Sequence, residues 1–187
     1  MSQKLMQNLP GKILSFLAVA LLTTLVIVGI RSATANDTTA AVRTAGWAEN
    51  LVMTGVEQSV PAKLDTGATT TSINAEVLEK PDDDVESGGF VTFNFVDTDG
   101  NKTLYERPLS RWVEIKGDGR RPVVEMSFCL DGEFIEGEVS LAERDEFDYA
   151  VLFGRNLLKQ ARFAVDSAQT FVTGEADPQA CREVSNQ

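Results

Sequence analysis

One aspartate in this sequence stands where a carboxylate could take part in a reaction. Asp65 follows Val60–Leu64, a short and largely apolar stretch that is typical of a strand, and it begins the run Asp-Thr-Gly-Ala. Gly67 lets the backbone pass close to the carboxylate, whose oxygens can then accept hydrogen bonds from nearby amides. The pattern indicates an aspartate held at a strand end as a general acid or base, although a turn-forming acid in an inactive domain would show it too.

The composition excludes several other chemistries. The 187 residues contain no histidine and two cysteines. A serine or cysteine hydrolase with an imidazole base is therefore ruled out, and the usual catalytic zinc sites take at least one histidine. Two cysteines cannot complete a four-cysteine zinc site. We expect no metal and no other cofactor.

The charge of the chain is strongly acidic after its first residues. The formal net charge is -11, and residues 1–35 hold three basic residues and no acidic one. The rest of the chain carries 14 basic against 28 acidic residues, a charge of -14. Such a surface repels phosphate backbones, so we expect no nucleic-acid partner.

The elements that must position Asp65 are mainly strands. Beyond Gly46, short apolar stretches alternate with Gly, Asp and Asn. Helical spacing appears only in Asn74–Lys80 and Asn156–Gln160. The expected strands are Val60–Leu64, Gly89–Val96, Lys102–Glu106, Arg111–Lys116, Val123–Leu130, Glu133–Leu141, Tyr149–Phe153, Arg162–Val165 and Thr170–Thr173. Hairpin turns are expected at Asp97–Gly100, Gly117–Gly119 and Asp131–Gly132.

A second segment makes the interpretation of Asp65 more specific. Residues 150–158 read Ala-Val-Leu-Phe-Gly-Arg-Asn-Leu-Leu, which predicts a buried strand that ends at glycine and opens a short helix. Together with Asp-Thr-Gly-Ala and the hairpin between them, this segment resembles the retropepsins, the retroviral-type aspartic peptidases. The resemblance covers about residues 46–174. It implies a mainly β fold, a retropepsin-like closed β-barrel (the acid protease fold) with short helices.

Within that fold the chain is most similar to a bacterial group labelled ATP-dependent zinc proteases, whose domains begin near a Gly-Trp such as Gly46-Trp47. The absence of histidine gives the zinc of that label no support. Three features depart from the family patterns. Thr69 stands where retroviral members have an acid that pairs with the motif arginine, and Asn74 stands where the bacterial group commonly has histidine. Arg120, Arg121 and Pro122 would stiffen the hairpin.

The resemblance implies a mechanism and a set of site residues. Aspartic peptidases use two carboxylates about 3 Å apart that share one proton. This chain has one Asp-Thr-Gly, so the second copy must come from another chain in a homodimer. The implied catalytic residues are Asp65, Thr66 and Gly67. The implied substrate-binding residues are Ala68, Gly117, Asp118 and Gly119, and the implied structural supports are Gly154, Arg155 and Asn156.

The chain before the domain is expected to be a targeting segment. Residues 13–30 are 18 residues without a charge, which as a helix would span about 27 Å, enough for the core of a bilayer. Ala33-Thr34-Ala35 offers the alternative of a cleaved signal peptide. We expect a cytoplasmic n-region at 1–12, a linker at 31–45, the domain at 46–174 and a polar tail at 175–187. Either reading exports the domain, to the periplasmic side of a bacterial inner membrane or as a soluble periplasmic protein.

Two further questions stay open at this stage. In an exported protein Cys129 and Cys181 could form a disulfide, or Cys129 could be a buried free thiol. Three functions are compatible with the sequence: a membrane-anchored homodimeric aspartic endopeptidase, an inactive binding module that docks to a membrane partner, and a hydrolase of glutamate-linked isopeptide bonds. The acidic charge argues against the third function unless Arg111, Arg120 and Arg121 line the cleft.

Overall fold

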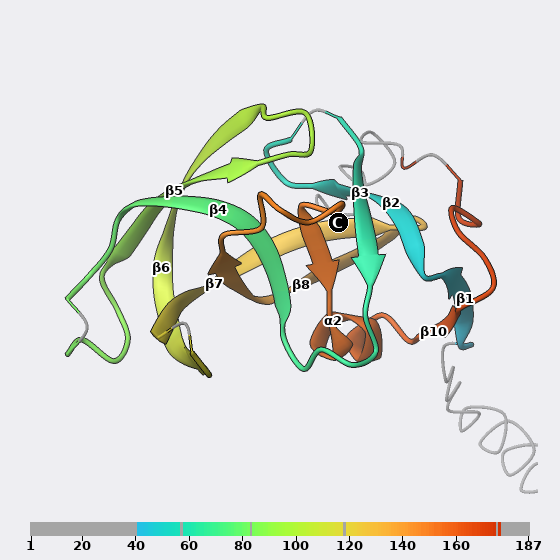
Figure 1. The fold of residues 1–187 in the computed structure, drawn as a ribbon. Coiled ribbons are helices and arrows are strands. Elements are labelled where there is room, and N and C mark those ends of the chain that lie inside the picture. Colours follow the sequence, from blue (N-terminus) through green and yellow to red (C-terminus); the bar gives the residue numbers. More distant parts are fainter. Residues whose placement is uncertain (1–40, 57, 83, 118, 175, 177–187) are drawn as a thin grey trace, which may run out of the picture. The chain divides into compact units, whose positions relative to one another are not determined.

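The computed structural model describes residues 41–56, 58–82, 84–117, 119–174 and 176. This part of the chain is mainly β, as predicted (Figure 1). Its elements are β1 (Arg43–Gly46), β2 (Ala48–Met53), β3 (Val60–Leu64), β4 (Thr71–Glu79), β5 (Phe90–Val96), β6 (Lys102–Ile115), β7 (Gly119–Leu130), β8 (Glu133–Ala142), β9 (Val151–Phe153), α2 (Arg155–Gln160) and β10 (Phe163–Asp166).

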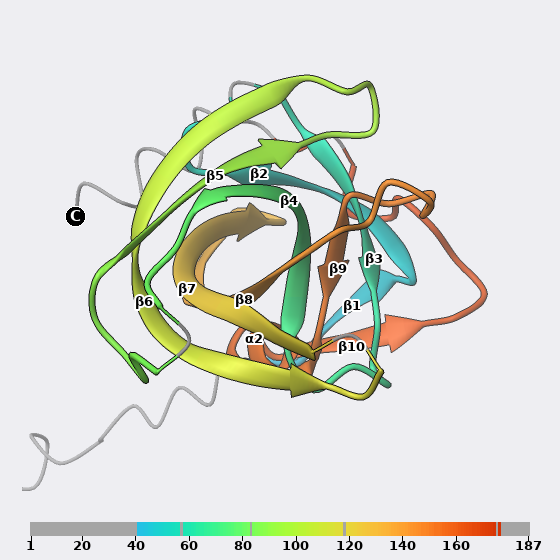
Figure 2. The same cartoon turned by 60° about the vertical axis from the view of Figure 1, so that its left-hand side comes forward.

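The main sheet closes on itself, in agreement with the predicted barrel. Its strand order is β2-β3-β9-β4-β5-β6-β7-β8, and the additional pairs β2–β7 and β4–β8 complete the ring (Figure 2). A second, two-stranded sheet pairs β1 with β10 in parallel. The core is apolar and aromatic, and the rings of Phe128 and Phe153 meet edge to face with centroids 5.6 Å apart.

Two adjacent strands bring the motif segments together. β3 and β9 pair in parallel, with Ala62 opposite Val151 and Leu64 opposite Phe153. Parallel neighbours end at the same edge of a sheet. The Asp-Thr-Gly segment after β3 and the Gly-Arg-Asn segment after β9 therefore leave the sheet side by side.

One predicted helix is wrong. All of Asn74–Lys80 except Lys80 lies in β4, which pairs with β9 and β8 through its first half and with β5 through its second half. The first five residues of β4 are buried because neighbouring strands flank this part of the strand on both sides. Tertiary pairing has overridden the helical spacing of a short segment.

The predicted strand at Thr170–Thr173 is wrong as well, because this segment forms bends and turns. The N–H groups of Val172 and Thr173 donate to the carboxylate of Glu49 and not to a strand. The sequence analysis also missed β1 and β2. β1 occupies the end of the expected linker at 31–45, where pairing with β10 makes ordered structure of a segment that carries no apolar period. The predicted short helix corresponds to α2, and Lys102–Glu106 and Arg111–Lys116 are parts of the single strand β6.

The structure answers one part of the predictions on the disulfide and on the ends of the chain. Cys129 is disulfide-bonded, which decides against a free thiol; its expected partner, Cys181, lies outside the described residues. The expected anchor at 13–30, the n-region and, apart from Ala176, the tail also lie outside them. In the described part of the chain, no helix is long and apolar enough to cross a membrane.

The turn between β5 and β6 is organised by one carboxylate. Asp97 Oδ1 accepts the N–H groups of Asp99 at 2.9 Å and Asn101 at 2.8 Å, and its Oδ2 accepts Asn101 Nδ2 at 2.9 Å. Burial raises the pKa of Asp97, but the hydrogen bonds from Asn101, Asp99 and Gly100 outweigh burial and leave this pKa below its ordinary value.

We expect Asp97→Ala to lower the free energy of unfolding by about 1 kcal/mol at neutral pH, because these bonds are lost at a half-exposed site. A lowered folded pKa contributes stability above the ordinary aspartate pKa and loses it as the pH falls through the folded value. The difference between wild type and variant should therefore shrink below about pH 4. Chemical denaturation across a pH series measures it, and a difference that persists unchanged in acid would contradict the assignment.

Candidate active site

Asp65 is held at the end of β3 by backbone and side-chain bonds. Its N–H donates to Phe153 O at 2.9 Å, which continues the pairing of β3 with β9. Its Oδ1 accepts the N–H groups of Gly67 at 2.8 Å and Ala68 at 3.2 Å. The side chain is half-buried, and the next residue, Thr66, is exposed. No described residue donates a hydrogen bond to the second carboxylate oxygen, Oδ2.

Two glycines are required by close contacts in this region. A Cβ on Gly67 would lie 3.0 Å from Asp65 Oδ1, so a side chain there would crowd the carboxylate. A Cβ on Gly154 would lie 2.8 Å from the backbone carbon of Thr70 and 2.9 Å from the backbone nitrogen of Thr71. Because a backbone cannot yield as a side-chain tip can, Gly154 marks the point where the two motif segments cross.

Arg155 fastens the Asp-Thr-Gly loop from the other segment. Its Nη1 donates to Thr66 O at 2.9 Å and Gly67 O at 3.0 Å, and its Nη2 donates to Thr69 Oγ1 at 2.9 Å. Its backbone N–H donates to Ala68 O at 2.9 Å. The hydroxyl of Thr69 therefore accepts from Arg155 at the position where the resemblance to retropepsins implied an acid.

Asn156 completes the connection deeper in the domain. Its Oδ1 accepts both the N–H and the hydroxyl of Thr71 at 2.9 Å, and its Nδ2 donates to Glu138 O at 2.7 Å. The Gly154 N–H donates to Thr71 Oγ1 at 3.0 Å. Both motif segments and β8 are thus tied through one amide and one hydroxyl. Thr71 was not among the predicted site residues, and only its place in the run of hydroxyl residues after Asp-Thr-Gly hinted at a role.

A buried cation was also missed by the sequence analysis. Arg144 lies between β8 and β9 and is 8% exposed. Its Nε donates to Tyr149 O and its Nη1 donates to Ser72 Oγ, both at 3.3 Å, and its guanidinium carbon lies 4.5 Å from the centre of the Phe147 ring. Among the described residues, no carboxylate forms an ion pair with Arg144. Nothing in the sequence distinguishes this arginine from surface ones.

The negative charge of Asp65 acts on Arg144. Burial lowers the pKa of Arg144 and so does the neighbouring charge of Arg121, whereas the negative charge of Asp65 raises it. Arginine stays protonated in proteins, so Arg144 keeps its positive charge despite these shifts. The shifts show instead which charges interact with it. Asp65 therefore lies within electrostatic range of a cation that forms no ion pair with a carboxylate in the described part of the chain.

A cleft of about 380 Å³ is lined by Glu143, the neighbour of this cation in the chain, while Arg144 itself lines a separate cavity of about 320 Å³ together with Asp97, Asp145 and Asp148. Arg121 connects the cleft with Arg144, because it lines the cleft and its charge acts on Arg144. The cleft is lined by Ala75, Val77, Leu78, Lys80, Arg120, Arg121, Pro122, Leu141 and Glu143. Of the three arginines considered from sequence, Arg111 is instead bound to Glu138 at 2.7 Å and does not line the cleft.

The glycines of the expected flap lie at the β6–β7 turn. Gly117 and Gly119 have φ angles of 87° and 78°, which glycine adopts without strain, and Asp118 between them lies outside the described residues. Both views place this turn and the loop after β3 toward the same, lower end of the barrel (Figures 1 and 2). Within the described chain, no hydrogen bond joins Gly117 or Gly119 to the Asp65 loop.

A metal site is not formed by the described side chains. No group of three or more histidine, cysteine, aspartate or glutamate residues in this part of the chain could hold a metal ion. The site as described offers one carboxylate, a set of loop amides and carbonyls, and a nearby guanidinium. Such groups can exchange a proton with water or a substrate and can bind an extended polar chain.

A closed barrel in which a Gly-Arg-Asn segment locks an Asp-Thr-Gly loop defines the retropepsin-like class of aspartic peptidases. Residues 44–176 match the RimB-like family, described as retropepsin-like aspartic endopeptidase RimB. The chain therefore belongs to the RimB-like family. The zinc-protease grouping expected from sequence is not confirmed by this match.

A solved structure supports the same fold. The chain is similar to Lpg0085 of Legionella pneumophila subsp. pneumophila str. Philadelphia 1, a protein of unknown function (DUF785). The identity is 28% and the TM-score 0.60, over 71% of this chain and 99% of the other. No curated protein matches the chain.

We expect Arg155→Lys to loosen the Asp65 loop although it keeps the charge, because an ammonium cannot reach two carbonyls and a hydroxyl as the planar guanidinium does. The free energy of unfolding should fall by about 1–2 kcal/mol. Thermal or chemical denaturation tests this, with Lys159→Ala as a matched exposed change in the same helix. Equal stability of the two variants would contradict the role of the guanidinium.

Proposed function

We propose that this protein is an aspartic endopeptidase whose catalytic base is Asp65. The observation that carries the proposal is the geometry of its loop: one carboxylate oxygen accepts the Gly67 and Ala68 N–H groups while Arg155 holds the same loop from outside. A carboxylate fixed in this way and left half-exposed can accept a proton from water as the water attacks a peptide carbonyl. Membership of the RimB-like family supports the same reaction class.

The active form we propose is a homodimer with a shared dyad. The described chain offers a single Asp-Thr-Gly, and the mechanism needs a second carboxylate about 3 Å from the first to hold the shared proton. A two-fold axis between two Asp65 side chains would supply the second one. Thr66, exposed next to Asp65, is then free to contact the partner chain, and Ala68 with the β6–β7 turn would contact substrate.

We also propose that the domain works on the periplasmic side of a bacterial inner membrane. Support comes from the uncharged run at 13–30 and from the disulfide at Cys129, because disulfides persist in oxidising compartments. Anchoring two chains to one membrane raises their effective concentration and favours pairing.

A second candidate substrate is favoured by the cations near Asp65. Arg144 is buried and forms no ion pair with a carboxylate among the described residues, and Arg121, which acts on it electrostatically, lines the nearby cleft with Lys80, Arg120 and Glu143. Arg120 is also ion-paired with Glu86 and Glu114. In a chain this acidic, such a cluster would attract an anionic polymer that the rest of the surface repels. The substrate would then be a glutamate-rich or glutamate-linked chain.

Asp65→Asn should abolish hydrolysis of an unfolded protein such as casein, because the amide can still accept the loop N–H groups but cannot act as a base. Asp99→Asn, at the exposed β5–β6 turn, is the matched control and should keep full activity. Excess Asp65→Asn chain should also inhibit the wild type by forming mixed dimers. Activity that survives the substitution, or that a chelator removes, would refute the mechanism, and activity unaffected by the inactive chain at every ratio would refute the shared site. Absence of hydrolysis by the wild type would favour the binding-module alternative.

Arg144→Gln should change selectivity more than turnover. The ratio of kcat/KM for a glutamate-rich peptide to that for a glutamine-rich peptide of equal length should fall about tenfold, the effect of losing one charge-assisted contact. Arg107→Gln, on β6 beside Tyr105, removes a charge elsewhere and is the control. An unchanged ratio would exclude Arg144 from substrate recognition.

A further inference from the structure

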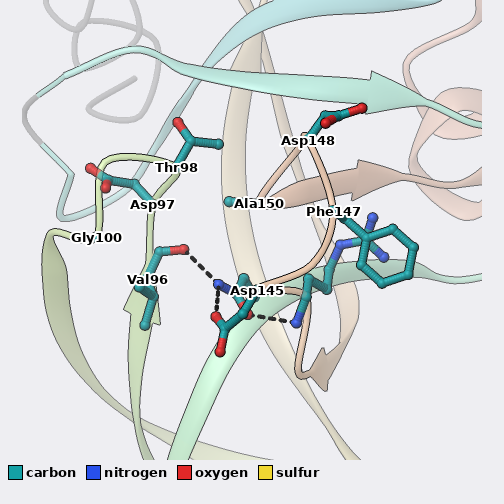
Figure 3. A pocket seen from close by; sticks show the side chains of 10 residues that line it. Val96, Asp97, Thr98, Gly100, Asp145, Phe147, Asp148 and Ala150 are labelled. Carbon is teal, nitrogen blue, oxygen red and sulfur yellow. Dashed lines mark hydrogen bonds between the residues drawn. The ribbon is translucent and has the colours of Figure 1, made fainter.

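The side chain of Asn74 joins three segments of the domain. Asn74 lies in β4 and is 5% exposed. Its Nδ2 donates to Asp145 Oδ1 at 2.9 Å and to Val96 O at 3.3 Å, and its Oδ1 accepts the Arg144 N–H at 2.7 Å; these bonds are the dashed lines of Figure 3. Its backbone N–H donates to Ala150 O at 2.7 Å. Both amide protons and the amide oxygen are therefore in use.

The segment that Asn74 holds is the irregular connection from β8 to β9. Its side chains at Asp145, Phe147 and Asp148 are exposed, and they border a cavity of about 320 Å³ (Figure 3). Arg144 is the buried member of this connection. The exposed residues around it bury little surface that could fix its place, so polar bonds must do so.

The bonds to Asn74 are the shortest of those that hold Arg144 and its neighbour Asp145. The guanidinium itself reaches Ser72 and Tyr149 only at 3.3 Å. The tight bond is made by the backbone N–H of Arg144, at 2.7 Å, and it fixes the start of the side chain. Moving that backbone would carry the guanidinium away from Ser72, which lies opposite Leu152 in β9, next to Phe153 whose carbonyl accepts the Asp65 N–H.

We infer that Asn74 is a positioning residue of the Asp65 site: its amide fixes the 143–149 segment and thereby sets Arg144 where it can bind a carboxylate of the substrate. The inference rests on the proposed function, in particular on recognition of an anionic chain. Asn74 itself contacts neither the substrate nor Asp65. It acts through the geometry of Arg144, so its loss should remove selectivity for charge and leave uncharged substrates bound as before.

The test measures binding and needs no turnover. Fluorescence anisotropy follows two labelled peptides of equal length, one glutamate-rich and one glutamine-rich, bound to protein that carries Asp65→Asn. Adding Asn74→Ala should raise the Kd of the glutamate-rich peptide about tenfold and that of the glutamine-rich peptide less than about twofold. Arg144→Gln should give the same pattern, and combining it with Asn74→Ala should add nothing further, because both changes remove one interaction.

Matched variants keep the test decisive. Asn94→Ala removes an amide that donates to exposed Glu76 at 3.0 Å and should leave both affinities unchanged. If Asn74→Ala does not fold, Asn74→Gln keeps the amide but displaces it by one methylene, and should show the same loss of selectivity without any change of charge.

Several results would overturn the inference. An equal rise in the Kd of both peptides would mean that Asn74 has only a structural role. Additive effects of Asn74→Ala and Arg144→Gln would mean that the two residues act independently. Failure of the parent protein to prefer the glutamate-rich peptide would remove the recognition that Asn74 is inferred to support. Selective binding by a protein that hydrolyses nothing when Asp65 is intact would instead refute the peptidase proposal and leave this inference standing.

Discussion

The crossing of two backbone segments at Gly154 is the constraint on which the site depends. The absence of a side chain there allows the Gly-Arg-Asn segment to pass within contact of Thr70 and Thr71. At that separation Arg155 reaches the carbonyls of the Asp65 loop and Asn156 reaches Thr71. A larger residue at 154 would push the segments apart and break several hydrogen bonds together. The parallel pairing of β3 with β9 makes the crossing available, because it ends both strands at one edge.

Positive charge is buried in a domain whose chain is acidic overall. The chain is acidic, yet the interior beside its candidate catalytic carboxylate holds a guanidinium with no carboxylate of its own among the described residues. Burying an unpaired charge costs free energy, and such costs are generally retained where a function requires them. Arg111 shows the contrasting case, since Glu138 binds its guanidinium at 2.7 Å and raises its pKa.

Sequence reasoning reached the parts of the structure that local patterns determine. The spacing of apolar residues and the turn-forming residues predicted most strands and the three hairpin turns. The two motifs indicated which loops would meet. It failed at β4, where pairing on both sides decides the conformation of Asn74 and its neighbours, and at β1, which becomes a strand through pairing with the distant β10. Arg144 could not be identified because its importance comes from burial, which no spacing in the chain expresses. Thr69 shows a subtler limit: the missing acid was visible, but the hydroxyl's use as an acceptor for Arg155 was not.

The two-stranded sheet at the start and end of the domain has a mechanical consequence. Because β1 and β10 run in parallel, with Arg43 opposite Phe163 and Gly46 opposite Asp166, the chain enters one strand and leaves the other at opposite ends of the pair. A force that pulls the entering and leaving segments apart is therefore directed along the strands and loads their hydrogen bonds together, not one after another. The salt bridges of Arg43 with Asp131 and Glu133 add a transverse tie to the β7–β8 turn. The β1–β10 pair is thus arranged to resist tension that is applied along its strands through the entering and leaving segments.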